Sequence, residues 1–179
     1  MSELDTLAKA GIQAINDKEY DKAIESFLQA LELEPDRPDI NNALGMAYLH
    51  RGDAGNAIPH LQRAVELAEP YDAPEAQEMK CHFHVQLATA YQLMDRVKEA
   101  VTVLKQIIER WPQKLEARMQ LGSLLLSACQ LDEGVEVYRG TFDMFEDKKD
   151  REAAEALTGA ITAFVESEHE ADIFLVGHQ

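Results

Sequence analysis

A 34-residue internal period constrains the fold of this chain more than any other feature of its sequence. The segment Tyr20–Pro35 has a counterpart 34 residues later in Ala54–Glu69, and Gly11 precedes Gly45 by the same interval. Two further copies carry matching small and large residues at Leu87, Ala88, Tyr91, Ala100, Leu104, Ile107 and Pro112, and at Leu121, Gly122, Leu125, Gly134, Tyr138 and Thr141. Such a period is typical of proteins in which each copy forms one unit that packs against its neighbours.

Each copy has the pattern of two amphipathic helices joined by a short turn. The first helix has a small residue at one repeated position, and the second has a small residue followed four positions later by a large one. Since residues four apart share a helix face, this spacing predicts tightly packed antiparallel helices. The small residues of the first helices are Gly11, Gly45, Ala88 and Gly122, and the small–large pairs of the second are Ala23/Phe27, Ala57/Leu61, Ala100/Leu104 and Gly134/Tyr138.

The pattern resembles the tetratricopeptide repeat (TPR) over roughly residues 4–148. The resemblance implies an all-α fold, a right-handed superhelical array of antiparallel helix pairs. Two features depart from the family pattern: the aromatic residue early in the first helix is missing, and the fourth repeat has Gly134 where alanine is usual. The four expected repeats span about 4–37, 38–71, 81–114 and 115–148.

Two proline-containing segments need a separate interpretation. About nine extra residues around Pro70 and Pro74 separate the second and third repeats, and we interpret them as a two-turn extension of the next helix, starting near Pro74, with a loop as the alternative. Pro59 falls where a helix interior would lose ~3 kcal/mol. We therefore expect that helix to begin late, with Asn56 as its N-cap.

The C-terminal part has two expected elements. Residues 149–168 have apolar residues at helical spacing and are predicted to form a capping helix, because a terminal repeat would otherwise leave its apolar face in water. Residues 169–179 are apolar and read as a buried strand entering a turn, similar to the first strand of bacterial sulfotransferases. The alternatives are that this segment folds back onto the capping helix, or that it mediates self-association through residues 171–176.

Composition excludes several partners. The chain has 33 acidic and 17 basic residues, a net charge of −16, which argues against binding to nucleic acid or to an anionic membrane. No apolar run approaches the ~20 residues of a membrane span. We see no signal peptide at the N-terminus, and Cys81 and Cys129 lie far apart, as in proteins of a reducing cytosol. These features predict a cytoplasmic, acidic protein.

The lack of catalytic motifs in the sequence predicts that the chain is not an enzyme and takes no cofactor. No phosphate-binding loop, nucleophile elbow, zinc-protease motif or dinucleotide-binding turn is present. Cys81 and His84 are three apart and share a helix face, but a metal site would need further ligands. Cys129 lies in a turn with apolar and acidic neighbours, so we assign it no redox role.

The TPR resemblance implies a concave groove lined by the first helices. Its predicted lining is mainly amides, hydroxyls, histidines and methionines, which suit an extended peptide because amides donate and accept and methionine adapts to varied side chains. The predicted groove residues are Lys9, Ile12, Asn42, Met46, His50, His82, Gln86, Thr89, Met119, Gln120 and Ser123.

The same resemblance excludes one kind of ligand. Many TPR domains hold the C-terminal carboxylate of heat-shock chaperones with a Lys/Asn/Asn/Lys/Arg clamp. The corresponding positions here are Ala8, Ile12, Ala43, His82 and Gln86, so the clamp is absent.

The predicted function is an interaction scaffold that binds a peptide or protein segment, and the net charge favours a basic one. One alternative is the non-catalytic N-terminal TPR segment of a larger enzyme, for example a sulfotransferase-like protein. Another is a secretion-type chaperone.

Overall fold

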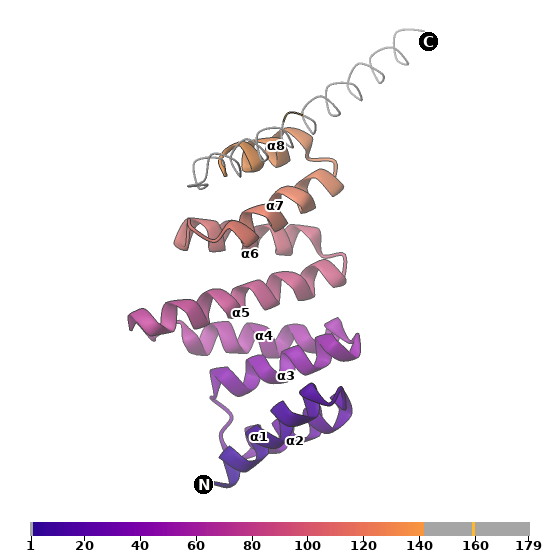
Figure 1. Cartoon of the computed structure of the whole chain (residues 1–179), viewed down its shortest axis with the longest axis vertical. Helices are drawn as coiled ribbons and strands as arrows, with labels where there is room; N and C mark the ends of the chain where they lie inside the picture. Colours follow the sequence, from indigo (N-terminus) through magenta and orange to yellow (C-terminus); the bar gives the residue numbers. More distant parts are fainter. Residues whose placement is uncertain (1, 142–158, 160–179) are drawn as a thin grey trace. The chain divides into compact units, whose positions relative to one another are not determined.

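The computed structural model describes residues 2–141 and 159, and these residues form α-helices and turns without a strand (Figure 1). This confirms the predicted all-α fold of paired helices. The helices are α1 (Glu3–Asn16), α2 (Tyr20–Leu33), α3 (Pro38–Arg51), α4 (Ala54–Ala68), α5 (Pro74–Leu93), α6 (Val97–Arg110), α7 (Leu115–Ser127) and α8 (Leu131–Arg139).

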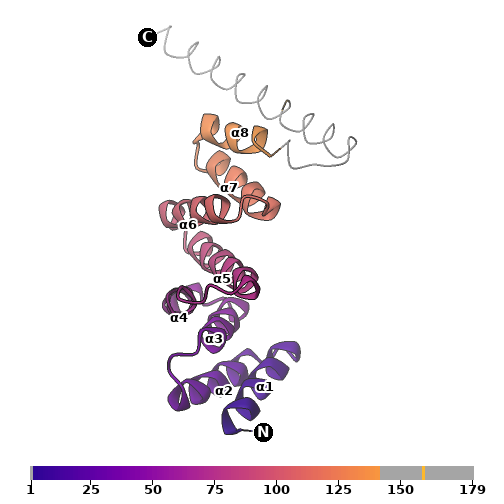
Figure 2. The ribbon, with the colours of Figure 1, turned by 90° about the vertical axis from the view of Figure 1, so that its left-hand side faces the viewer.

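The chain forms two compact units, Met1–Val103 and Leu104–Gln179, and the boundary lies within α6. In the first unit each helix from α1 to α5 packs against the next. The odd-numbered helices also contact one another, α1 with α3 and α3 with α5. Figure 2 shows α4 displaced to one side of α3 and α5. The first helices of the repeats therefore lie side by side in one layer of this unit.

The turns after the first helices repeat the sequence period in the backbone. One residue in each turn adopts a left-handed conformation, and a backbone amide just after it bonds to a carbonyl five residues earlier, as in Glu19 to Ala14 and Asp53 to Tyr48. The left-handed residues are separated by 34, 43 and 34 positions, so the nine extra residues fall between the second and third turns. The four left-handed residues are Lys18, Gly52, Asp95 and Cys129.

The predicted contacts between small and large residues are present. A β-carbon at Gly11 would lie 2.6 Å from the ring of Phe27, and one at Gly122 would lie 2.7 Å from the ring of Tyr138. These distances are shorter than any van der Waals contact, so each helix pair approaches so closely only because glycine occupies the first helix. The 34-residue period thus reflects a repeated packing contact.

The extra residues lengthen α5, as predicted. The helix begins at Pro74, where proline suits the first helical turn, and has 20 residues against 14 in α1 and α3. Lys80, which is 2% exposed, lies in the added part and donates from Nζ to the carbonyl of Glu69 at 2.7 Å. Its side chain therefore links the added turns of α5 to the end of α4 through a hydrogen bond.

The prediction for the start of α4 is wrong. The helix begins at Ala54, and its N-cap is Asp53, whose Oδ1 accepts from the amide of Asn56 at 3.2 Å. Pro59 therefore lies inside the helix. Proline has no N–H, so the carbonyl of Gly55, four residues earlier, loses its usual helical hydrogen bond. Gly55 is exposed, so water can bond to that carbonyl instead.

The described part of the second unit includes the pair α7 and α8, which pack against each other. The predicted capping helix at 149–168, the strand-like segment at 169–179 and the self-association segment at 171–176 lie outside the described residues. No helix of the described part is both long and apolar enough to cross a membrane.

Candidate peptide-binding face

The exposed side of the first helices in the Met1–Val103 unit is the candidate site, and we call it the first-helix face. The intervals between the turns, 34 and then 43 residues, place equivalent positions of α1, α3 and α5 in rows across neighbouring helices. Five rows make up the face: Asp5, Asp39 and His82; Ala8, Asn42 and Val85; Lys9, Ala43 and Gln86; Ile12, Met46 and Thr89; and Asn16, His50 and Leu93.

The centre of the face is apolar. Ile12 is 53% exposed although it is a large aliphatic residue within a helix, and Met46 and Thr89 in the same row are half-buried. The hydroxyl of Thr89 donates to the carbonyl of Val85 at 3.0 Å, so its methyl group and its oxygen lone pair remain for a ligand. This row offers a partly exposed apolar strip flanked by polar groups.

One edge of the face is acidic. Asp5 belongs to the capping box of α1, and hydrogen bonds from Ser2 lower the pKa of its carboxyl. Burial alone would raise the pKa of Asp39, but the bonds and charge of Arg37, 2.7 Å away, outweigh it and the pKa is lowered. Both carboxylates are therefore ionised at neutral pH. The third member of the row, His82, is exposed.

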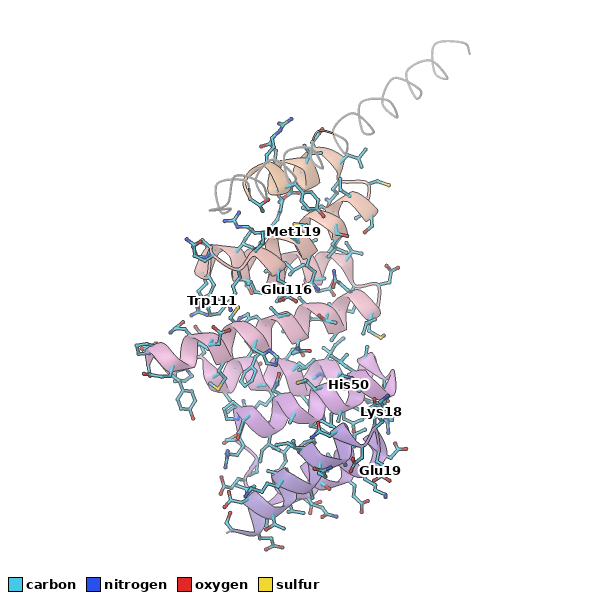
Figure 3. The ribbon with its side chains drawn as sticks, viewed as in Figure 1. Lys18, Glu19, His50, Trp111, Glu116 and Met119 are labelled. Carbon is cyan, nitrogen blue, oxygen red and sulfur yellow. The ribbon has the colours of Figure 1, made fainter. Side chains whose placement is uncertain are left out.

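The opposite edge lies beside the turns. The imidazole of His50 stacks on the ring of Tyr20 with centroids 5.6 Å apart, and Figure 3 shows His50 close to the turn that carries Lys18 and Glu19. Leu93, in the same row, is 62% exposed. Sequence reasoning missed Leu93, although the nine-residue insertion, added to the 34-residue period, identifies it as the equivalent of His50.

Asn42 is the most unusual residue of the face. It is only 6% exposed, and its Nδ2 donates to the sulfur of Met46 at 3.4 Å. Its Oδ1 is the one buried side-chain oxygen or nitrogen in the described residues without a hydrogen-bond partner. The neighbouring Asn41 differs, since its Nδ2 donates to the carbonyls of Pro35 and Arg37 at 3.2 and 2.9 Å.

The predicted groove residues of α7 belong to the second unit and are not part of the first-helix face. Met119 and Gln120 are half-buried and Ser123 is exposed; Figure 3 labels Met119 and, one turn before it, Glu116. The carbonyl of Met119 accepts a bond from the hydroxyl of Tyr138 at 3.2 Å. Burial raises the pKa of that hydroxyl, although a bond with Ser123 acts in the opposite direction.

The residues considered for a metal site do not form one in the part of the chain that is described. Cys81 and His84 are both buried, and Nδ1 of His84 lies 2.8 Å from the carbonyl of Lys80. In that part no three His, Cys, Asp or Glu side chains come close enough together to hold a metal ion.

Comparison with known proteins agrees with the geometry. Two family models, each described as tetratricopeptide repeat, match residues 9–72 and 84–114. The crystal structure of the MamA protein has a TM-score of 0.72 at 18% identity, covering 93% of this chain and 86% of that one.

Two further solved structures have peptide-binding descriptions. The first TPR of Spaghetti (RPAP3), bound to the HSP90 peptide SRMEEVD, has a TM-score of 0.62 at 18% identity and covers 71% of this chain and 94% of its own. YrrB, a TPR protein with an unusual peptide-binding site, has a TM-score of 0.63 at 18% identity, with coverages of 86% and 74%. No curated protein sequence matches the chain significantly. The helix pairs, the repeated turns and the two family models show that this chain belongs to the tetratricopeptide repeat family.

Proposed function

We propose that the chain is a cytoplasmic, non-catalytic interaction scaffold that binds an extended segment of a protein partner on the first-helix face. The observation that carries this proposal is the row of Ile12, which is exposed, and Met46 and Thr89, which are half-buried. The aliphatic side chain of Ile12 is 53% exposed within a helix, and its removal from water by a partner would favour binding.

The mixture of groups around this row suits a peptide better than a small metabolite. Amide and hydroxyl groups of Asn42, Gln86 and Thr89 accompany the apolar strip, and such groups can bond to an extended backbone. Two of the structural neighbours, RPAP3 and YrrB, are described as peptide-binding, which supports the same use of this fold here.

The proposed ligand differs from a chaperone C-terminus. The positions of the carboxylate clamp are held by residues such as Ala8, Ile12 and Ala43, which cannot bind a carboxylate. The carboxylate of Asp5 at this edge and the net charge of −16 favour a segment with Lys or Arg beside its apolar residues, although Asp39 is already paired with Arg37. We therefore propose an internal, basic and partly aliphatic segment.

Affinity capture with matched variants tests the face. Ile12→Glu places a charge in the apolar row of the first-helix face, and Leu28→Glu makes a similar change at a site on α2 that is 41% exposed. We expect immobilised wild-type and Leu28→Glu protein to retain the same partners from a lysate of the source organism, and Ile12→Glu to lose them. Loss with Leu28→Glu alone would assign binding to the second helices instead.

A further inference from the structure

The Asn42 side chain has an unmet bonding capacity inside the candidate face. An asparagine amide has two donor hydrogens and an acceptor oxygen, and burial without a partner for the oxygen is costly. Asn42 is 6% exposed, its Oδ1 has no partner, and its Nδ2 bonds only to sulfur, which is a weak acceptor. In either orientation of the amide, the nearby sulfur satisfies at most one of its two ends.

Met46 contacts this amide. Its sulfur lies 3.4 Å from Nδ2 of Asn42, one helical turn away on the same side of α3. A methionine side chain has three rotatable bonds and adapts to new neighbours easily. A change of the Met46 rotamer would therefore release Nδ2 of Asn42 from the sulfur at little cost.

We propose that Asn42 is a backbone-reading residue, shielded by Met46 until a partner binds, and that its amide pairs with both the N–H and the C=O of one residue in an extended segment. The inference rests on the proposed function and specifies its chemistry. In an extended chain the N–H and C=O of one residue point to the same edge, as strand pairing requires. An asparagine amide presents an acceptor and a donor side by side and matches that edge.

The surrounding residues define the side chains of this segment. Ile12 and Met46 share a row beside Asn42, so an aliphatic side chain of the partner can lie on them. The carboxylate of Asp5 lies at the adjacent edge of the face, where Asp39 is already paired with Arg37, so Lys or Arg suits the positions of the segment near Asp5. The occupant is therefore an extended segment with an aliphatic residue between basic ones.

Asn41 provides a matched control. It is as buried as Asn42, at 4% exposure, but its Nδ2 bonds to the backbone carbonyls before α3. Asn41→Leu should lower the melting temperature because it breaks these bonds. Asn42→Leu should leave the melting temperature unchanged or raise it, because it removes a buried acceptor without a partner.

The test uses the blocked tripeptide acetyl-Lys-Leu-Lys N-methylamide, titrated at millimolar concentration into the full chain. NMR follows the side-chain amide of Asn42 and the ε-methyl group of Met46. We expect both signals to shift, Asn42→Leu to weaken binding at least about fivefold, and Asn41→Leu to leave binding to the folded protein unchanged. N-methylation of the tripeptide, one residue at a time, should weaken binding similarly at one position.

The outcomes separate this inference from the proposed function. If Ile12→Glu abolishes binding but neither Asn42→Leu nor any N-methylation weakens it, the face binds peptides and the role of Asn42 is wrong. If the tripeptide shifts no signal of α1, α3 or α5, both proposals fail. Equal binding of acetyl-Glu-Leu-Glu N-methylamide would contradict the basic character of the segment.

Discussion

Gly45 of α3 lies against Leu61 of α4 so closely that a β-carbon on the glycine would be 2.5 Å from Cγ of the leucine. Leu61 is fully buried between its neighbours in the core. The two helices are held at this distance by the absence of a side chain at one position. The same relationship recurs in Gly11 with Phe27 and Gly122 with Tyr138.

The first prediction concerns this contact. Gly45→Leu should lower the free energy of unfolding by ~1–3 kcal/mol, because the added side chain overpacks the contact between α3 and α4. Urea denaturation monitored by circular dichroism measures the change. Gly55→Leu is the control, since a β-carbon there would meet nothing closer than 3.9 Å, and it should change stability little. Equal effects of the two substitutions would contradict the packing described here.

The second prediction is a loss of stability in mild acid through His60. Its ring stacks on that of Tyr48 with centroids 5.7 Å apart, and burial lowers the pKa of His60 below the ordinary value of 6.5. The folded state thus favours the neutral ring, so this stabilisation is complete above pH 6.5 and is lost as pH falls through the folded pKa.

Melting temperatures between pH 7.5 and pH 5 test this effect. The variant His60→Phe keeps an aromatic ring beside Tyr48 but cannot titrate, and its melting temperature should fall less over this range than that of the wild type. The same pH dependence in both proteins would mean that His60 does not contribute to it.

The third prediction concerns Lys80. Lys80→Ala should reduce the free energy of unfolding by ~1.5–3 kcal/mol, because the hydrogen bond from the buried Nζ to the carbonyl of Glu69 is lost. The connection from α4 to α5 should also be cut faster by proteases. Lys98→Ala, at an exposed site, should show neither effect. Unchanged cleavage at residues 70–73 in Lys80→Ala would show that the bond from Lys80 to Glu69 does not hold this connection in place.

The fourth prediction concerns association kinetics. Because the chain carries a net charge of −16, a basic partner segment should be steered toward it, and screening acts over ~8 Å at physiological ionic strength. Stopped-flow measurements should show an association rate that decreases as salt is added, with a smaller change in dissociation. An association rate that does not depend on salt would exclude electrostatic steering.

The fold could be predicted because its determinants are periodic in the sequence. A small residue and a large residue recur in every repeat, 34 positions apart except where the insertion adds nine, and Pro74 identifies the start of the lengthened α5. The start of α4 was mispredicted because Asp53 is the better-placed cap and because the exposure of Gly55 makes Pro59 tolerable inside the helix. That tolerance depends on solvent exposure, which the local sequence does not show.

The candidate face was only partly predictable for the same reason. Periodicity identifies which helix positions are equivalent, but it does not show which side chains are covered. The stacking of His50 on Tyr20 and the burial of Asn42 depend on how neighbouring helices and side chains pack. The bond between Asn42 and Met46, which motivates the further inference, is likewise visible only in three dimensions.

Calorimetric titration of two variants with the partner segment found by affinity capture is the most direct test of binding on the first-helix face. The double substitution Met46→Ala and Gln86→Ala should weaken binding about tenfold or more, which corresponds to ~1.4 kcal/mol. Glu32→Ala, at an exposed site on α2, should leave the affinity unchanged. Melting temperatures measured in parallel ensure that folded proteins are compared. A loss of affinity in Glu32→Ala with none in the double variant would show that the partner binds the second helices.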